Sequence, residues 1–222
     1  MTPPAYRWSA AAALALAALA IGSVIATRTT GVEDAAQGYR GSPAAVSSPL
    51  PDFALRDQDG RVVRSAELRG KVTLLTFLDT QCTEACPIIA AQVARTLDRL
   101  TPDERAHVAA IAISADPKED TPASIRAFLR RNHAERQLRY LSAPQDTLRP
   151  VWQAAQILPS ADTDDDDTHS APVRIYGRDG RWIATQHVGA DLSLDNLAHD
   201  IRLALSQERT ARDVTPHQPP LI

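Results

Sequence analysis

Apolar residues fall into short continuous runs and helical repeats that follow one another along the chain. Two runs, at residues 72–78 and 108–113, are continuous and contain β-branched residues, which is typical of strands buried on both faces of a sheet. Apolar residues at helical spacing follow these runs, at residues 88–100 and 125–129, and predict a helix after each strand. The middle of the chain is therefore predicted to alternate strand and helix.

Further elements complete this pattern on both sides. Short strands are expected at residues 52–55, 61–63 and 138–141, a single helical turn at 65–68, and helices at 148–155 and 194–205. Residues 173–176 and 182–186 flank the turn Arg178-Asp179-Gly180 and predict a hairpin. Parallel strands joined through helices, followed by an antiparallel pair, predict an α/β fold: a three-layer sandwich of the thioredoxin type with a mixed sheet.

The first residues predict a membrane segment. Residues 8–27 carry no charge, and Arg7 and Arg28 flank them. A helix of about 20 residues spans about 30 Å, the hydrocarbon thickness of a bilayer. We expect residues 1–28 to be a single N-terminal transmembrane anchor or, as the alternative, a signal peptide cleaved before Thr27. The positive N-terminal end favours a cytoplasmic N-terminus, which places the rest of the chain on the extracytoplasmic side of the cell membrane, periplasmic or outer.

The remaining sequence divides into three predicted parts. Residues 29–48 are rich in Gly, Ser, Ala and Pro without a hydrophobic period, and predict a flexible linker. Residues 49–206 contain the strands and helices and are long enough for one hydrophobic core. Residues 207–222, with prolines near their end, predict a flexible tail.

The composition excludes several classes of protein. Among 222 residues, 24 Lys and Arg stand against 27 Asp and Glu, and this net charge of −3 gives no basis for binding nucleic acid. With 44% hydrophobic and 23% charged residues, the chain is not disordered as a whole. Its two cysteines are too few for a disulfide-rich scaffold or a four-cysteine zinc site.

The two cysteines lie where a buried strand leads into a helix, in the stretch Thr80-Gln81-Cys82-Thr83-Glu84-Ala85-Cys86-Pro87. Sites form at the carboxyl ends of strands in open α/β sheets. Two thiols four residues apart can approach the same bound atom. The N–H groups at the helix start favour the thiolate form of a cysteine. Thiolates select Cu(I) or zinc, and imidazole suits both metals. Two sulfurs leave such a metal under-coordinated, so a third ligand is expected from elsewhere.

One of the six histidines stands apart from the others. His169 opens the last strand pair after a loop containing the acidic run 164–167, and in a thioredoxin-type sheet this loop passes near the cysteines. Cys82, Cys86 and His169 are therefore candidates for a site of two sulfurs and one nitrogen, the alternatives being a structural disulfide and a surface histidine. The acidic run is either a solvated loop tip or a means of concentrating copper ions. His187 is a reserve candidate, and the remaining histidines are expected to be solvated or capping residues: His107, His133, His199 and His217.

Three blocks of sequence resemble the Sco/SenC family of copper chaperones. The first is the spacing C-x-x-x-C-P at Cys82, Cys86 and Pro87, and the third is His169-Ser170 ahead of the hairpin turn. The second, S-x-D-P-x-x-D-T-P after a strand, is formed by Ser114, Asp116, Pro117, Asp120, Thr121 and Pro122. The resemblance implies a thioredoxin-like fold with copper, Cu(I) or Cu(II), held by Cys82, Cys86 and His169. It also implies a role in assembling the binuclear copper centre of cytochrome c oxidase.

The resemblance implies partners and also has departures. The expected partners are the copper-centre subunit of the oxidase or another copper acceptor, a thiol reductant, and the membrane through the N-terminal helix, but no nucleic acid. Many members have proline where Thr83 stands and aspartate where Thr168 stands, and different residues at Leu78 and Asp79. These departures indicate a divergent bacterial branch and bear on partner choice more than on the ligands.

Three functions remain open from the sequence. The first is a metal carrier, which is not an enzyme. The second is an extracytoplasmic thiol–disulfide oxidoreductase in which Cys82 and Cys86 form a redox-active pair and keep the copper-site thiols of a partner reduced. Redox proteins of this fold usually have C-x-x-C, so the longer spacing favours metal binding. The third is a structural disulfide, which gains little from closing so short a loop.

Overall fold

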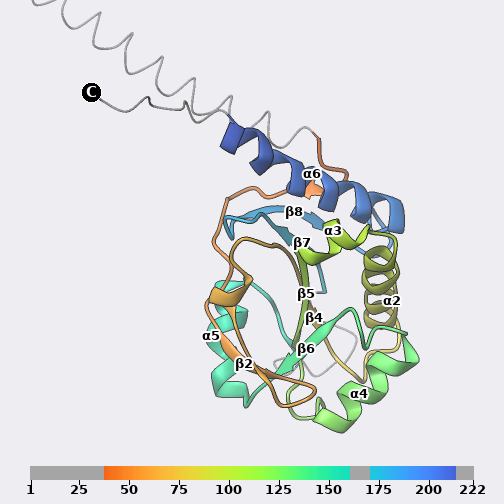
Figure 1. Cartoon of the computed structure of the whole chain (residues 1–222). Coiled ribbons are helices and arrows are strands. Elements are labelled where there is room, and N and C mark those ends of the chain that lie inside the picture. The colour runs from red at the N-terminus through yellow and green to blue at the C-terminus, as the bar shows by residue number, and fades with distance from the viewer. Residues whose placement is uncertain (1–37, 161–170, 214–222) are drawn as a thin grey trace, which may run out of the picture. The chain divides into compact units, whose positions relative to one another are not determined.

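A mixed sheet forms the middle layer of the protein in this computed structural model, which describes residues 38–160 and 171–213, with side chains up to residue 207 (Figure 1). Its eight strands within these residues run in the order β1 (Ser42–Pro43), β8 (Trp182–Gln186), β7 (Val173–Tyr176), β4 (Val72–Leu78), β5 (Val108–Ser114), β6 (Arg139–Ser142), β2 (Ala54–Asp57) and β3 (Val62–Arg64). The pairs β4–β5 and β5–β6 are parallel, and the other pairs are antiparallel. All seven residues of β4 are buried, as expected for the middle of a covered sheet.

Helices cover both faces of this sheet (Figure 1). They are the 3₁₀ turn η1 (Ser65–Leu68) and the α-helices α2 (Ala85–Asp98), α3 (Pro102–Ala106), α4 (Pro122–Arg131), α5 (Gln145–Ala154) and α6 (Leu194–Asp213). One hydrophobic cluster joins the sheet to α2, α4 and α6, and a second joins its other face to α5, β2 and β3. The predicted three-layer α/β fold of the thioredoxin type, with parallel strands first and an antiparallel hairpin last, is therefore confirmed.

Local sequence explains where two of these helices begin. Thr121 accepts the N–H of Ser124 and precedes Pro122, so α4 starts with a hydroxyl cap and a proline, as predicted. Helix α3 was not expected, because five residues without a buried side chain leave no hydrophobic period. It is held by a capping box in which Thr101 and Glu104 bond each other's backbone N–H groups.

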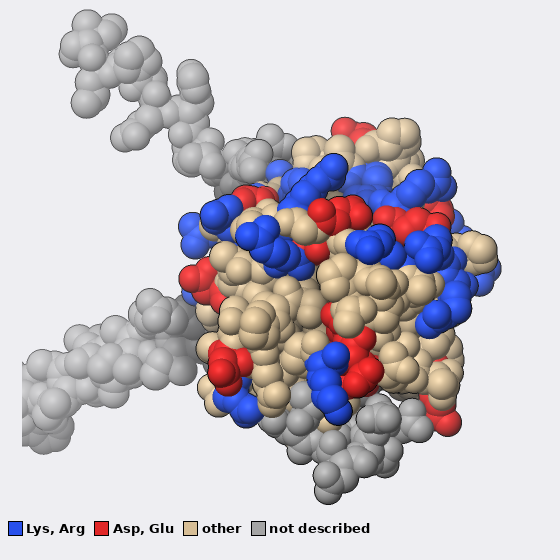
Figure 2. Space-filling view, turned by 90° about the horizontal axis from the view of Figure 1, so that it is seen from below, with Lys and Arg blue, Asp and Glu red and all other residues tan. Residues whose placement is uncertain are grey.

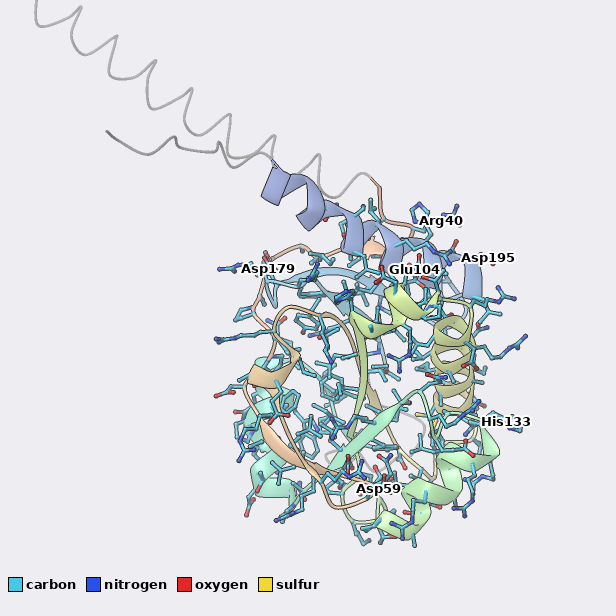
Figure 3. All side chains as sticks on the ribbon, viewed as in Figure 1. Arg40, Asp59, Glu104, His133, Asp179 and Asp195 are labelled. Atoms are coloured by element: carbon cyan, nitrogen blue, oxygen red, sulfur yellow. The ribbon has the colours of Figure 1, made fainter. Side chains whose placement is uncertain are left out.

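The folded domain begins before residue 49, which corrects the predicted linker boundary. Strand β1 pairs with β8, and the backbone N–H groups of Arg40 and Gly41 donate to the buried carboxylate of Asp200 on α6 at 2.8 and 2.9 Å. Figure 3 shows Arg40 at the end of the molecule where α6 and α3 lie. A Cβ at Gly41 would lie 2.6 Å from the carbonyl oxygen of Thr185, so glycine permits a close approach here.

The C-terminal boundary also differs from the prediction. Helix α6 continues to Asp213, whereas a flexible tail was expected from residue 207. The added residues are mostly polar, with helix formers among them, and so give no apolar period. The predicted anchor at 1–28, the linker up to residue 37 and the tail beyond 213 lie outside the described residues. No helix within the described residues is long and apolar enough to cross a membrane.

Candidate metal centre

The two cysteines lie at the carboxyl end of β4, where the sequence predicts them. Cys82 is in the loop between β4 and α2 and is 6% exposed, and Cys86 is the second residue of α2 and is fully buried. Both are thiols and belong to the hydrophobic cluster under α2. Pro87 occupies the first turn of the helix, as expected.

One backbone N–H at the start of α2 is directed at Cys82. The N–H of Cys86 donates to Cys82 Sγ at 3.4 Å, which favours negative charge on that sulfur. The hydrogen bond with Cys82, followed by burial, raises the pKa of the Cys86 thiol well above its ordinary value, against a hydrogen bond from the Asp79 backbone. At Cys86 this shift opposes the thiolate that the helix start was expected to favour, and a metal bound there would have to displace the thiol proton.

A buried carboxylate below the loop fixes its backbone. Asp120 is 2% exposed and accepts hydrogen bonds from the N–H of Thr80 at 2.9 Å and from Ser114 Oγ at 2.6 Å. Tyr140 Oη lies 2.7 Å from the same carboxylate and 2.6 Å from the carbonyl oxygen of Leu78. Burial raises the pKa of Asp120 to about 6, and the hydrogen bonds oppose this rise.

The Tyr140 hydroxyl has one proton for two acceptors. When that proton goes to Leu78, a second proton on Asp120 satisfies the remaining short contact. The raised pKa of Asp120 agrees with such a shared proton. The network therefore holds the end of β4 and Thr80, two residues before Cys82.

A second carboxylate ties the loop to the segment beyond α5. Asp79 is fully buried and accepts hydrogen bonds from the N–H of Gln81 at 2.7 Å and from Ser160 Oγ at 3.0 Å. Ser160 is the last described residue before 161–170. The cysteine loop is thus held from below by Asp120 and from the side by Ser160.

A surface hollow gives access to Cys82. It is lined by residues of the loop and of the end of α4, namely Thr80, Gln81, Cys82, Thr83, Pro87, Phe128, Arg131 and Asn132. Lys and Arg side chains stand beside Asp and Glu side chains on the face drawn in Figure 2, in agreement with the nearly balanced composition.

The predicted third ligand, His169, and the acidic run 164–167 lie outside the described residues, as does His217. Among the histidines that the structure describes, His133 and His187 are exposed, and His199 Nδ1 lies 3.1 Å from Asp200 Oδ1. Within residues 38–160 and 171–207, no three His, Cys, Asp or Glu side chains form a group able to hold a metal. The structure thus brings the two sulfurs together and does not test the imidazole.

Sequence reasoning missed the residues that support the loop. Asp79 and Asp120 were noted only for their place in motifs, and Tyr140 and Ser160 not at all. A signal existed for Asp120, because it follows a buried strand beside the expected site. Tyr140 and Ser160 reach the loop from 62 and 81 residues away from their partners, and local pattern carries no such information.

Comparison with known proteins places these features in a family context. The SCO1/SenC family model matches residues 41–206. An SCO2-like protein of Rickettsia typhi is 26% identical over 68% of this chain and 74% of its own length. The copper-bound structure of Bradyrhizobium japonicum ScoI is 28% identical, with a TM-score of 0.55 over 71% of this chain and 98% of that one. A structure described as identifying a disulfide switch in BsSco, a member of the Sco family of cytochrome c oxidase assembly proteins, is 21% identical, with a TM-score of 0.61 over 75% and 97% of the two chains.

Proposed function

Because the chain belongs to the SCO1/SenC family, we propose that it is a copper-binding metallochaperone that carries Cu(I) on Cys82, Cys86 and His169. The observation that carries this proposal is the pairing of the two sulfurs at the end of β4, with the N–H of Cys86 directed at Cys82. Two soft sulfur donors on a fixed loop favour Cu(I) over harder cations. A relative of known structure, ScoI of Bradyrhizobium japonicum, has copper bound.

The third ligand is proposed from the placement of its neighbours. Ser160 is bonded to Asp79, in the cysteine loop, and Ala171 lines the same cavity as Ala85, which precedes Cys86. His169 is two residues from Ala171, and chain connectivity keeps their Cα atoms within about 8 Å of each other. We propose that the imidazole of His169 completes the site from there.

The acceptor and the location follow from the same proposal. We propose delivery of copper to the copper-centre subunit of cytochrome c oxidase, the role printed for the family of BsSco, from a membrane anchor at residues 8–27 with the domain on the extracytoplasmic side. Cys82 is the sulfur that lines a surface hollow, so a docked acceptor would displace it first and the buried Cys86 last. Stepwise exchange of ligands then moves the ion without releasing it to solvent.

Copper titration of the reduced full chain in a non-ionic detergent tests the ligand set. We expect one Cu(I) to be bound in competition with a chelator, no binding by Cys82→Ser or Cys86→Ser, and affinity more than about tenfold weaker for His169→Ala. His133→Ala, an exposed histidine at the end of α4, is the matched control and should bind as the wild type does. Unchanged affinity in the cysteine variants refutes the proposal, and unchanged affinity in His169→Ala removes this residue from the ligands.

Delivery is tested separately in the cell that makes the protein. Deletion of the gene should lower the absorbance of the binuclear copper centre in isolated oxidase, and wild type but not Cys82→Ser should restore it. A fully loaded copper centre in the deletion strain would contradict the proposed delivery and would leave the proposal of copper binding unaffected.

The close approach of the two thiols favours a second function, a thiol–disulfide oxidoreductase. Oxidation of Cys82 and Cys86 to a disulfide releases two electrons and two protons, which convert a disulfide of the partner into two thiols. The BsSco relative has been described as having a disulfide switch. Rapid reduction of a disulfide substrate by the copper-free protein, lost in Cys86→Ser, favours this function, and negligible turnover favours the carrier.

A further inference from the structure

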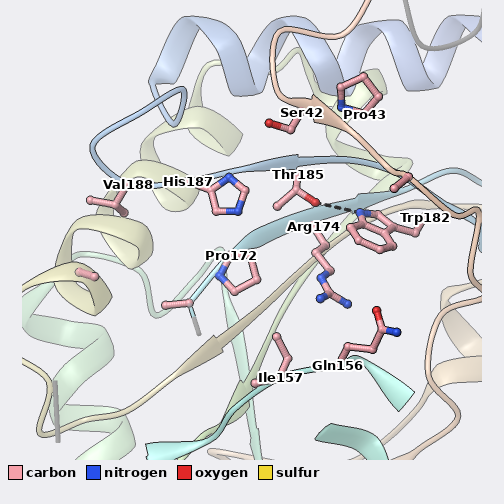
Figure 4. Close-up of a pocket in the computed structure, with 13 residues that line it drawn as sticks. Ser42, Pro43, Gln156, Ile157, Pro172, Arg174, Trp182, Thr185, His187 and Val188 are labelled. Atoms are coloured by element: carbon pink, nitrogen blue, oxygen red, sulfur yellow. Dashed lines mark hydrogen bonds between the residues drawn. The ribbon is translucent and has the colours of Figure 1, made fainter. Parts of the chain in front are cut away.

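A second cavity shares no lining residue with the hollow at Cys82. It has a volume of about 560 Å³ and is bounded by β1, β7, β8, the residues after α5 and the start of α2 (Figure 4). This volume falls within the range of small-molecule sites. None of the described residues that line it is one of the proposed copper ligands.

The cavity contains a buried cation, Arg174. The side chain extends from β7 between Trp182, Gln156 and Pro172 (Figure 4), and the residue is only 7% exposed. No carboxylate among the described residues forms an ion pair with it, and its Nε has no hydrogen-bond partner there. Burying a charge without an opposite charge is costly, so the guanidinium is a site for an anion that the described residues do not supply.

The neighbours of Arg174 hold it without neutralising it. The guanidinium carbon lies 4.4 Å from the centre of the Trp182 ring, a cation–π contact. Tyr176 lies two residues along β7 on the same face and forms a hydrogen bond with Arg174. Burial raises the pKa of Tyr176 against the opposing effect of Arg174, so its hydroxyl stays protonated. A neutral hydroxyl and an aromatic ring orient the guanidinium and leave its charge available.

The walls of the cavity are mostly apolar and one is rigid. Pro43, Ile157, Pro172 and Trp182 line it. The indole Nε1–H of Trp182 is directed at Thr185 Oγ1 at 2.9 Å and at the Ala184 carbonyl at 3.0 Å, which fixes the plane of the ring. Arg174 is the one Lys or Arg among the described lining residues, and further polar groups come from Ser42, Gln156, Thr185 and His187. A single guanidinium in a mostly apolar cavity matches a ligand that has one negative charge and an apolar body.

We propose that this cavity binds a small organic carboxylate. The planar fork of a guanidinium matches the two oxygens of a carboxylate, and the aromatic and proline walls accept the rest of the ligand. A phosphate ester would carry a second negative charge, which one arginine does not balance, into a mostly apolar site. Arg174 would bind the carboxylate, and Trp182 would pack on the apolar body.

Benzoate is a suitable probe, and benzamide is its neutral match. We expect benzoate at pH 7 to shift the Trp182 indole N–H signal of the full chain, in non-ionic detergent, saturably and with a dissociation constant in the millimolar range. Benzamide and equal concentrations of sodium chloride should leave the signal in place. Trp182→Phe assigns the signal, since the chain has three tryptophans.

Variants at Arg174 complete the test. Arg174→Gln should weaken benzoate binding at least about tenfold and Arg174→Lys less, because lysine keeps the charge and loses the fork. Arg130→Gln, an exposed arginine on α4, is the control and should leave binding unchanged. Equal shifts with benzoate and benzamide, or no saturable shift with benzoate, overturn the proposal, and this comparison on the wild type needs no variant to fold.

Discussion

Replacing Asp120 by asparagine should change how the stability of the protein depends on pH. Burial raises the pKa of Asp120 from 3.8 to about 6, so the folded state holds this proton more tightly than the unfolded state does. The unfolded chain releases its proton first as the pH rises, and the free energy of unfolding falls between about pH 4 and pH 6. A difference of about 2 in pKa corresponds to about 3 kcal/mol.

Asparagine is matched to the site. Its oxygen accepts the N–H of Thr80, and its amide N–H groups reach the oxygens of Tyr140 and Ser114. The Tyr140 proton then goes to the carbonyl of Leu78 at 2.6 Å, and the Ser114 hydroxyl has to turn its proton away from residue 120. Asp120→Asn therefore resembles the protonated wild type. We expect the two proteins to differ little near pH 4 and the variant to gain about 3 kcal/mol relative to the wild type by pH 7.

Urea unfolding of the copper-free, reduced chain at a series of pH values measures this difference. Trp152 reports on the region, because its Nε1–H donates to the Ser114 carbonyl at 2.9 Å and Ser114 bonds Asp120. Asp116→Asn, on the same loop but partly exposed, is the control and should show no comparable change. A difference between Asp120→Asn and wild type that is constant from pH 4 to pH 8 would refute the reasoning.

Three further substitutions test the packing of the domain. Asp200→Ala leaves the backbone N–H groups of Arg40 and Gly41 unsatisfied and should lower the free energy of unfolding by more than about 2 kcal/mol. The control Asp195→Ala, at an exposed ion pair, should lower it by less than about 1 kcal/mol. Equal losses in urea unfolding would contradict this. Gly41→Ala places a Cβ 2.6 Å from the Thr185 carbonyl oxygen and should speed amide hydrogen exchange in β1, so unchanged exchange would rule out the close approach. Trp152→Ala leaves a cavity at a fully buried position and should lower the free energy of unfolding by about 3–5 kcal/mol, measured by urea unfolding. A loss below about 1 kcal/mol would contradict this, because it would mean that neighbouring side chains fill the cavity.

Most of the fold could be predicted because burial follows the period of each element. The strand at residues 72–78 was predicted with its observed bounds, since every position in it is buried and apolar or nearly so. The start of α4 was predicted from Thr121 and Pro122, which act through local bonds. Elements whose stability comes from distant partners could not be predicted in this way.

Strand β1 is such an element. Its neighbours in the sequence are small residues typical of a linker, and its stability comes from Asp200, about 160 residues away. The same holds at the site. Cys82 and Cys86 could be predicted to lie together, because a strand and a helix next to each other in the sequence bring them together. The supporting residues Tyr140 and Ser160 could not, because they are distant in the sequence. The raised pKa of Cys86 was only partly within reach of local reasoning, because its largest cause is the hydrogen bond with the nearby Cys82, whereas the second, burial, depends on the whole core.

The short strand β1 also has a consequence for association between copies of the protein. Exposed edge strands are templates on which further chains add strands and aggregate. The described sheet ends on one side at a two-residue strand in which Pro43 has no N–H to offer, and on the other at the three-residue β3. A chain that added a strand at either of these edges would gain few backbone hydrogen bonds, so neither edge favours association through the sheet.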